Sequence, residues 1–372
     1  MKDVGIIADD LSGACDVGSC FVPTAGAALI ALTPGAARHD FSRPEVINCQ
    51  SRSLSAEQSR GRARIAGRRF ASRPVIFKKI DAAFRGPVGA ELEGLLQAVG
   101  DRKVIVAPAV PRIGRITKGG LQFIGGTPIH EGEFAKDPSW PIFSASVLEN
   151  IRRTGEIKCD VCDAESDEDL DRIVDVALQQ LPVVLVGSVG LADALARRVQ
   201  GGGQATRPYA AGAKRPAVIS GSSYRQTHAQ LEWAALRWGV SIRDIRPHAA
   251  EEGGVGLGWS PPFILRISPD ILKENSSPSQ IIDEFCIRAV AVLKYLRPDA
   301  FVLIGGDTTY RIMNEFGVES LVVDGRVVPG VSTGHLVGGI FNELPFVLKG
   351  GSVGDLDIVS RMIDYLCVCV CV

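Results

Sequence analysis

Short apolar runs alternate with amphipathic stretches along the first half of the chain, and this alternation constrains the fold more than any other feature. The runs suit buried strands, and the stretches between them have helical patterns. One helix should begin at Ser55, with Gln58 as its capping-box partner. Because strands that alternate with helices form a mostly parallel sheet with helices on both faces, we predict this arrangement. The expected strands cover 4–8, 27–32, 46–49, 75–80 and 103–108.

The alternation is interrupted at 201–216, where three consecutive glycines open a stretch of linker-like composition. Strands and helices alternate again after it, and 372 residues are enough for two separate cores. We therefore predict an α/β fold of two domains, each a mostly parallel sheet flanked by helices, with a ligand cleft between them. The predicted parts are an N-terminal domain over 1–203, a linker over 204–216, a C-terminal domain over 217–366 and a tail over 367–372.

The bulk properties exclude several classes of partner. The formal net charge is −1, so no overall field attracts nucleic acid or an anionic membrane surface. No apolar run is long enough to span a bilayer, and the chain begins with acidic residues where a signal peptide needs an apolar core. We expect a cytoplasmic protein without nucleic-acid or membrane partners, and its nine cysteines are expected as reduced thiols. A homodimer is left open.

Two adjacent carboxylates end the first apolar strand, in the stretch GIIADDLSGACD at 5–16. Asp9 and Asp10 lie where the strand turns into a helix, and open α/β sheets bind ligands at such turns. Asp16 follows within two helical turns, so three carboxylates can converge there. Helix capping is the structural alternative, but one Asp would suffice for it, whereas two adjacent ones repel each other. We therefore favour a functional role.

A second polar group follows the strand at 75–80. Asp81 ends the strand, and a carboxylate there suits a polyol hydroxyl and could take its proton. Arg85 offers a planar fork for a substrate carboxylate. Solvated charge for Lys79, an N-cap for Asp81 and a structural histidine for His130 are the alternatives. The candidate catalytic residues are Asp9, Asp10 and Asp81, and the candidate substrate ligands are Asp16, Lys79, Arg85 and His130.

Three strand ends in the predicted C-terminal domain carry glycine-rich turns: SGSS at 220–223, GGDTT at 305–309 and KGGSVGD at 349–355. Glycine lets a backbone approach a polyanion, and successive N–H groups form an anion nest in front of a helix. Three such turns favour a nucleotide triphosphate, although the standard P-loop and dinucleotide motifs are missing. The candidate nucleotide-binding residues are Ser220, Ser222, Gly305, Gly306, Asp307, Thr308, Gly350 and Gly351.

Turn residues give two local predictions. Asp324-Gly325 stands between the apolar runs 321–323 and 326–328, which predicts a hairpin with a type I′ turn. Paired glycines punctuate short apolar pieces within 113–129, which predicts a hairpin or an irregular loop.

Together these motifs resemble those of the four-carbon acid sugar kinases. The family's I-A-D-D-L-T-G-A-x-D is similar to IADDLSGACD at 7–16, and its K-x-D-S-T-x-R-G-x-x-G-x-E to KIDAAFRGPVGAE at 79–91. Similar segments follow, in the family's order, at 108–120, 130–138, 220–222, 305–308, 329–331 and 349–355. The resemblance covers nearly the whole chain. It implies an N-terminal sugar-acid domain and a C-terminal ATP domain.

The resemblance implies a kinase that uses ATP and Mg²⁺ to phosphorylate a tetronate-like acid on its terminal hydroxyl. Two departures bear on the substrate: Ala82-Ala83 stands where the family has Ser-Thr, and HEGE replaces HET. Because hydroxyl contacts are lost there, we expect poor turnover of the usual tetronates. The alternatives are a weakly active or inactive sugar-acid-binding protein of the same family and a sugar-acid dehydrogenase.

Overall fold

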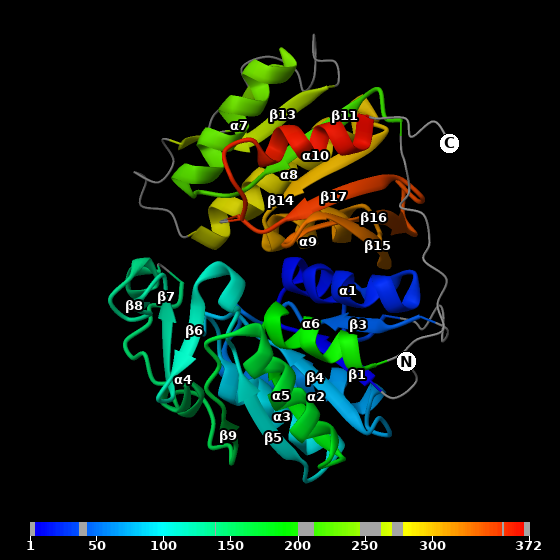
Figure 1. Cartoon of the computed structure of the whole chain (residues 1–372). Coiled ribbons are helices and arrows are strands. Elements are labelled where there is room, and N and C mark those ends of the chain that lie inside the picture. The colour runs from blue at the N-terminus through cyan, green and yellow to red at the C-terminus, as the bar shows by residue number, and fades with distance from the viewer. Residues whose placement is uncertain are drawn as a thin grey trace. The chain divides into compact units, whose positions relative to one another are not determined.

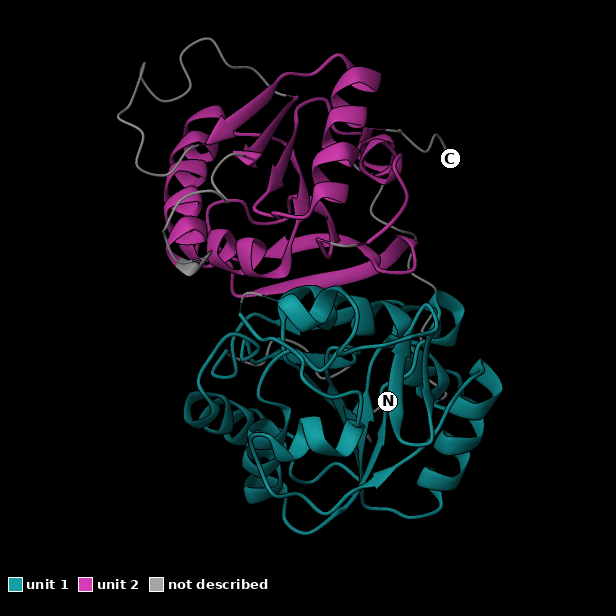
Figure 2. Cartoon of the chain, turned by 90° about the vertical axis from the view of Figure 1, so that its left-hand side faces the viewer, with its two compact units in different colours: residues 1–205 teal, residues 206–372 magenta. Residues whose placement is uncertain are grey.

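The computed structural model describes residues 4–36, 43–137, 139–199, 212–245, 262–269, 278–351 and 353–367. The chain divides into two compact units, residues 1–205 and 206–372 (Figure 2). Each unit has its own arrangement of strands and helices (Figure 1). Residues 204–211 of the predicted linker and 368–372 of the predicted tail lie outside the described residues, and the predicted domain boundaries stay predictions.

The strands of the first unit pair in the order β2-β3-β1-β4-β10-β5-β9, and all of these pairings are parallel. Every residue of β1, β4 and β10 is buried, as expected for a parallel sheet that has helices on both faces. The alternation predicted from the sequence is therefore confirmed. The strands are β1 (Val4–Ala8), β2 (Ala28–Ala31), β3 (Glu45–Asn48), β4 (Val75–Lys79), β5 (Lys103–Ala107), β9 (Asp160–Val161) and β10 (Val183–Gly187).

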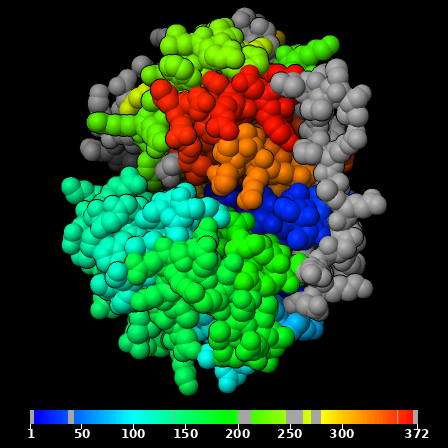
Figure 3. Space-filling view, in the orientation of Figure 1, coloured from blue at the N-terminus to red at the C-terminus, as the bar shows by residue number. Residues whose placement is uncertain are grey.

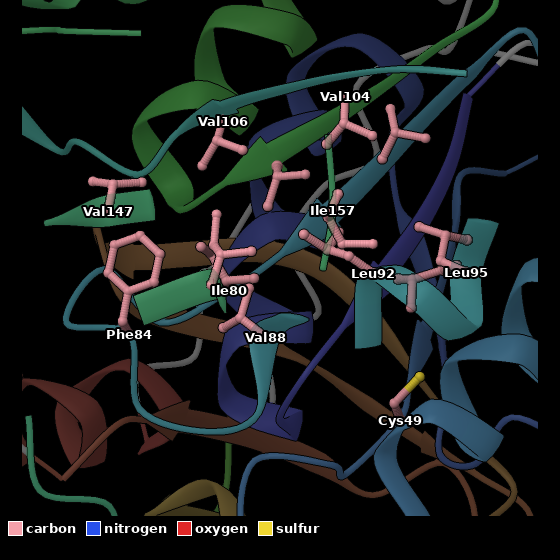
Figure 4. Close-up of a cluster of buried hydrophobic side chains, with 14 of the residues drawn as sticks. Cys49, Ile80, Phe84, Val88, Leu92, Leu95, Val104, Val106, Val147 and Ile157 are labelled. Atoms are coloured by element: carbon pink, nitrogen blue, oxygen red, sulfur yellow. The ribbon is translucent and has the colours of Figure 1, made fainter. Parts of the chain in front are cut away.

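Helices cover both faces of this sheet. On one face, Leu92 and Leu95 of α3 join Val104 and Val106 of β5 in a buried hydrophobic cluster (Figure 4). On the other face, α6 contacts both α1 and α5, and α5 and α6 form much of the surface of this unit seen in Figure 3. The predicted capping box of Ser55 and Gln58 is present at the start of α2. The helices are α1 (Leu11–Ala25), α2 (Ala56–Arg69), α3 (Val88–Val99), α4 (Val147–Arg152), α5 (Asp167–Leu178) and α6 (Val189–Arg198).

The glycine-rich segment 113–129 forms a small antiparallel sheet of its own. Strands β6 (Arg115–Lys118), β7 (Leu121–Ile124) and β8 (Thr127–Pro128) pair in that order. Both tight turns consist of glycine pairs with positive φ, from +57° to +81°, a conformation that other residues rarely adopt. The sequence prediction of a hairpin is confirmed. The segment Pro111–Ile113 that precedes it and Glu133–Lys136 that follows are short 3₁₀ helices.

In the second unit the strands pair in the order β12-β13-β11-β14-β17-β16-β15. The first five are parallel, and β16 and β15 continue the sheet as antiparallel strands. The strand β12 was not predicted, because its exposed residues give it no apolar run. The strands are β11 (Pro216–Ser220), β12 (Ile242–Ile245), β13 (Phe263–Ile267), β14 (Ala300–Ile304), β15 (Ser320–Val328), β16 (Val331–Val337) and β17 (Pro345–Lys349).

Four helices accompany this sheet in the described residues. Leu231 of α7 and Met362 of α10 pack with Val302 and Val347 of the strands, so these two helices share one face (Figure 1). The other two, α8 and α9, contact each other. Among the described residues, no helix combines the length and apolar character that crossing a bilayer requires. The helices are α7 (Arg225–Trp238), α8 (Pro278–Leu296), α9 (Gly306–Glu315) and α10 (Ile358–Cys367).

The hairpin predicted at Asp324-Gly325 is wrong. Both residues lie inside β15, and the turn comes later, at Pro329-Gly330, where Gly330 has a φ of +84°. The register shifts between Val323 and Gly325, so the sequence Asp-Gly marks a bulge and not a turn. The Asp324 carboxylate is buried and accepts a hydrogen bond from Thr333 Oγ1 of β16 at 3.1 Å, which holds the residue within the sheet.

Candidate active site

The central strands of the first unit end at the same level. Asn48 of β3 is in register with Ala8 of β1, Ala8 with Lys79 of β4, and Lys79 with Gly187 of β10. Residues that follow these strands in the chain are therefore brought to one edge of the sheet, although they are far apart in sequence. The predicted residues Asp9, Asp10, Lys79 and Asp81 all lie at this edge, which is where parallel sheets bind ligands.

Arg52, from the loop after β3, joins the two adjacent carboxylates. Its Nε donates to Asp9 Oδ2 at 2.9 Å, and its Nη2 donates to Asp10 Oδ1 at 2.6 Å. Lys79 approaches from the other side, with Nζ 3.2 Å from Asp9 Oδ1 and 3.7 Å from Asp10 Oδ1. Asp9, Asp10 and Lys79 are all buried, so the alternative of solvated charge for Lys79 is wrong.

The charges of this cluster keep Asp9 ionised. Burial alone would raise the pKa of Asp9, but Arg52, Lys79 and Lys78 outweigh it and hold this pKa well below its ordinary value. The Asp9 backbone carbonyl also accepts hydrogen bonds from the amides of Ser51 and Arg52, at 2.8 and 3.3 Å. Asp9 is thus fixed by both its side chain and its backbone.

Asp10 both caps α1 and belongs to the cluster. Its Oδ1 accepts from the backbone amide of Gly13 at 3.1 Å, and its Oδ2 accepts from Ser12 Oγ at 2.5 Å. The capping alternative is therefore correct for Asp10, and it does not exclude the contact with Arg52. A Cβ atom at position 13 would lie 2.4 Å from Lys79 Nζ and 2.5 Å from Asp10 Oδ1, so a larger residue there would displace these charged groups.

Asp81 and Arg85 form a second ion pair beside this cluster. Arg85 Nε lies 2.7 Å from Asp81 Oδ2, and the chain between them turns through Phe84, whose φ is +60°. Burial would raise the pKa of Asp81, but Arg85 and Arg52 hold it well below its ordinary value. The Arg85 guanidinium also lies 5.2 Å from the centre of the Phe134 ring and 3.8 Å from Asp137 Oδ2.

His130 and Asp16 are the predicted ligands with the weakest structural support. His130 begins the segment that carries Phe134 and Asp137, which contact Arg85, but its own Nε2 lies 3.6 Å from Glu131. Asp16 is partly buried in α1, where its backbone carbonyl accepts from Ser19 Oγ at 2.7 Å. Both assignments stay predictions.

Behind the cluster lies a buried ion pair that the sequence analysis did not identify. Lys78 Nζ is 3.1 Å from Glu91 Oε2, and both side chains are almost fully buried. Ser51 donates to the other oxygen of Glu91. Burial would lower the pKa of the Lys78 ammonium, but Glu91 and Asp9 raise it, so Lys78 is a permanent cation beneath Asp9.

In the second unit, three strand ends are likewise level. Ser220 of β11 is in register with Ile304 of β14, and Ile304 with Lys349 of β17. The turns that follow are closely packed: a Cβ at Gly221 would lie 2.0 Å from Thr308 Oγ1, and one at Gly351 would lie 2.8 Å from Ser222 Oγ. The structure thus brings together the three turns that carry the predicted nucleotide-binding residues.

Helix α9 begins inside the second glycine-rich turn. Gly305 is its N-cap, with a φ of +101°, and Gly306 is its first residue. Asp307 and Thr308 therefore belong to the first helical turn. The amide of Gly305 donates to the carbonyl of Lys349 at 3.0 Å, which ties this turn to the end of β17.

Comparison with protein families agrees with this division of the chain. Residues 4–159 match a sugar-binding N-terminal domain, and residues 268–359 match a nucleotide-binding C-terminal domain. Together the two matches cover more than half of the chain. The chain belongs to the four-carbon acid sugar kinase family.

Relatives of known activity are similar to this family member over almost their whole length. A D-threonate kinase of Salmonella typhimurium is 25% identical, covering 97% of each chain. A D-erythronate kinase of Heliobacterium modesticaldum is 26% identical, covering 98% of this chain and 97% of its own, and a 3-oxo-tetronate kinase of Burkholderia multivorans is 25% identical with the same coverage. A crystal structure of a Salmonella typhimurium LT2 protein shares the fold, with a TM-score of 0.77 at 19% identity over 97% of this chain and 98% of that one.

The two alanines that depart from the kinase family's motif are both buried, and they have different surroundings. Ala83 belongs to the hydrophobic cluster of the first unit, together with Ile80, Phe84 and Val88 (Figure 4). A hydroxyl at position 83 would therefore enter the core. Ala82 is 1% exposed and lies next to Asp81. The expectation that substrate contacts are missing at these two positions stays a prediction.

Proposed function

We propose that the chain is an ATP-dependent kinase that phosphorylates a hydroxyl of a four-carbon sugar acid. The observation that carries the proposal is the cluster of Asp9, Asp10, Arg52 and Lys79 at the carboxyl edge of the unit that matches a sugar-binding domain. The family relatives named as kinases of D-threonate, D-erythronate and 3-oxo-tetronate support both the reaction and the substrate class.

In this proposal Asp9 orients the acceptor hydroxyl. An ideal general base has a pKa near the operating pH, and the pKa of Asp9 is held far below that. A carboxylate that is always ionised still accepts a hydrogen bond and directs the hydroxyl oxygen toward the phosphorus atom. Phosphoryl transfer passes through a loose transition state, so positioning matters more than early proton removal. Asp10 and Asp81 supply the neighbouring acceptors.

Cations at the same edge hold the acid and the transferred group. These cations are already paired with carboxylates, so a bound carboxylate must share or replace an existing partner. Arg85 is suited to this exchange, because its side chain is 20% exposed and its fork already holds a carboxylate. We propose Arg85 as the anchor of the substrate carboxylate, with Lys79 close to the reacting hydroxyl. At this edge the three carboxylates of Asp9, Asp10 and Asp81 are balanced by the three cations of Arg52, Lys79 and Arg85.

The second unit is proposed to bind ATP. Its glycine positions leave no room for a Cβ at Gly221 or Gly351, which suits a backbone cradle for phosphates. The described residues contain no group of three potential metal ligands. Mg²⁺ is commonly held by substrate phosphates and one or two carboxylates, so the phosphates of ATP would supply part of its ligands. Mg²⁺ would neutralise charge on the phosphates when bound. A ligand cleft between the units and a homodimer stay predictions.

A coupled assay of ADP formation tests the proposal. The purified chain is incubated with ATP, Mg²⁺ and each of D-threonate, D-erythronate and 3-oxo-tetronate, with Asp9→Asn as the control for contaminating kinases. We expect turnover with at least one acid that is lost in the variant. If no acid supports turnover, the proposal is wrong as a statement of activity.

A second candidate function is an inactive sugar-acid-binding protein, which the buried Ala82 beside Asp81 favours. Thermal-shift measurements with the same acids distinguish the two functions, because an inactive binder is stabilised by an acid that it does not phosphorylate. The variant Ala82→Ser restores the hydroxyl at the position next to Asp81. A gain of turnover in this variant would assign the loss to Ala82.

A further inference from the structure

Buried side chains hold the backbone carbonyls of the segment after β17. Gly350 O accepts from Lys349 Nζ at 3.2 Å, and Gly351 O accepts from Lys349 Nζ at 3.3 Å and from Thr227 Oγ1. Gln230 Nε2 lies 3.3 Å from Val353 O, 2.7 Å from Gly354 O and 3.1 Å from Asp355 O. The exposed Gln226 of α7 also donates to Gly354 O, at 2.8 Å. Two buried residues of α7 and one of β17 therefore bind five carbonyl oxygens.

These donors lie in the interior and not on the surface. Thr227, Gln230 and Lys349 are each 0% exposed, and α7 packs on the same face of the sheet as α10, which follows this segment in the chain. The Oε1 atom of Gln230 is buried without a hydrogen-bond partner among the described residues. The side-chain amide of Gln230 therefore uses its NH₂ group and leaves its oxygen without a partner. This indicates that Gln230 is placed to bind the three carbonyls.

The inward direction of the carbonyls fixes the direction of the amides. In a trans peptide the C=O of one residue and the N–H of the next point in opposite directions. Because the carbonyls of Gly350 and Val353 point toward the interior, the amides of Gly351 and Gly354 point away from it. Gly351 also lies against Ser222, on the turn after β11. Outward-facing amides beside a second glycine-bearing turn are suited to donate hydrogen bonds to an anion.

We propose that Thr227 and Gln230 are positioning residues for nucleotide phosphates, which they serve by turning the amides of Gly351 and Gly354 outward. The inference rests on the proposed function, because it assumes that this unit binds a nucleotide. Neither side chain touches the phosphates. Each acts through the backbone, so its loss should affect ligands with phosphates and spare a ligand without them.

Calorimetric titration of the full chain with ADP and with adenosine tests this proposal. Thr227→Val keeps the shape of the side chain and removes the donor, and Gln230→Met keeps its length. A buried carbonyl that loses its hydrogen-bond donor changes an equilibrium constant by roughly 5- to 150-fold. We expect ADP affinity to fall about tenfold or more in each variant and adenosine affinity to stay within twofold.

Thr227→Ser retains the hydroxyl and is the matched control, in which ADP affinity should be close to that of the unmodified chain. If Gln230→Met does not fold, the comparison of Thr227→Val with Thr227→Ser still decides the test. Equal losses for ADP and adenosine would show a general structural role and overturn the inference, as would variants that bind ADP normally. An unmodified chain that binds neither ligand would overturn the proposed nucleotide site and the inference with it.

Discussion

Each unit fully buries a lysine at the carboxyl end of a central strand, and the two lysines are stabilised in different ways. Lys78 of β4 pairs with the Glu91 carboxylate at 3.1 Å; burial would lower the pKa of this ammonium, but Glu91 and Asp9 raise it. Lys349 of β17 donates to two backbone carbonyls, and burial lowers its pKa to about 7. The first unit pairs its buried charge, whereas the second surrounds it with dipoles.

The same difference extends to the two candidate sites. In the first unit, side-chain charges from the loops after β1 and β3 and from the end of β4 form ion pairs with one another, so each residue can be tested directly by substitution. In the second unit the proposed ligand contacts are backbone amides, which substitution reaches only through supporting side chains such as Thr227 and Gln230. Loss of a single charge should therefore have a larger effect than loss of a single support.

The largest effect is expected for Asp9→Asn. This variant removes the ionised carboxylate between Arg52 and Lys79, so kcat should fall on the order of 10²- to 10⁴-fold, as for loss of a positioned catalytic group. Asp10→Asn is the matched comparison, because Asn caps a helix about as well as Asp. Steady-state kinetics and melting temperatures of both variants provide the measurement. An equal loss in Asp10→Asn would mean that the two carboxylates act as one unit.

The Asp residues at the site could be predicted from the sequence, whereas their main partner could not. Asp9, Asp10 and Asp81 directly follow apolar strands, so their place at the sheet edge follows from local pattern. Arg52 belongs to the loop after β3, and its contact with Asp9 depends on β3 lying beside β1, which is a property of strand order. The residue pattern within one segment does not reveal the order of the strands in the sheet.

Residues inside helices were missed for a related reason. Glu91, Thr227 and Gln230 occupy ordinary helical positions, and a polar residue there is usually on the solvent side. Their burial follows from packing against loops distant in sequence. The wrong prediction at Asp324-Gly325 also has a tertiary cause. The two residues are a strong turn signal, but the pairing of β15 with β16 keeps them inside a strand. Local chemistry predicted the strand ends, and tertiary contacts decided the rest.

The next effect concerns the buried ion pair. Glu91→Leu leaves the Lys78 ammonium buried without its carboxylate, so the free energy of unfolding should fall by about 3–5 kcal/mol. The double variant Lys78→Met with Glu91→Leu removes both charges and should recover much of this loss. Urea denaturation of the two variants measures the difference. If the double variant is the less stable of the two, Lys78 and Glu91 do not depend on each other.

A smaller effect is expected for Arg85→Lys. The charge is kept and the fork is lost, so affinity for the sugar acid should fall by about 1–3 kcal/mol, while ATP affinity should barely change. Calorimetric titrations with each ligand separate the two. A variant that binds the acid normally and ATP weakly would identify Arg85 as a phosphate ligand.

The smallest effect is a pH dependence of stability that should distinguish the two lysines. The pKa of Lys349 is about 7 in the folded chain and has an ordinary value of 10.5, so between these values the unfolded chain binds one more proton than the folded chain. The free energy of unfolding should therefore rise with pH in this window, by at most about 1.4 kcal/mol per unit.

Lys349→Met removes this contribution, so the stability of the unmodified chain relative to the variant should increase by about 2 kcal/mol from pH 7 to pH 9. The double variant at Lys78 and Glu91 is the control: the pKa of Lys78 is raised, Lys78 stays charged throughout this range, and its removal should leave the slope unchanged. Denaturation at several pH values measures both slopes. A flat difference for Lys349→Met would show that Lys349 stays protonated in the folded chain, and the contrast between a paired and an unpaired buried lysine would then be lost.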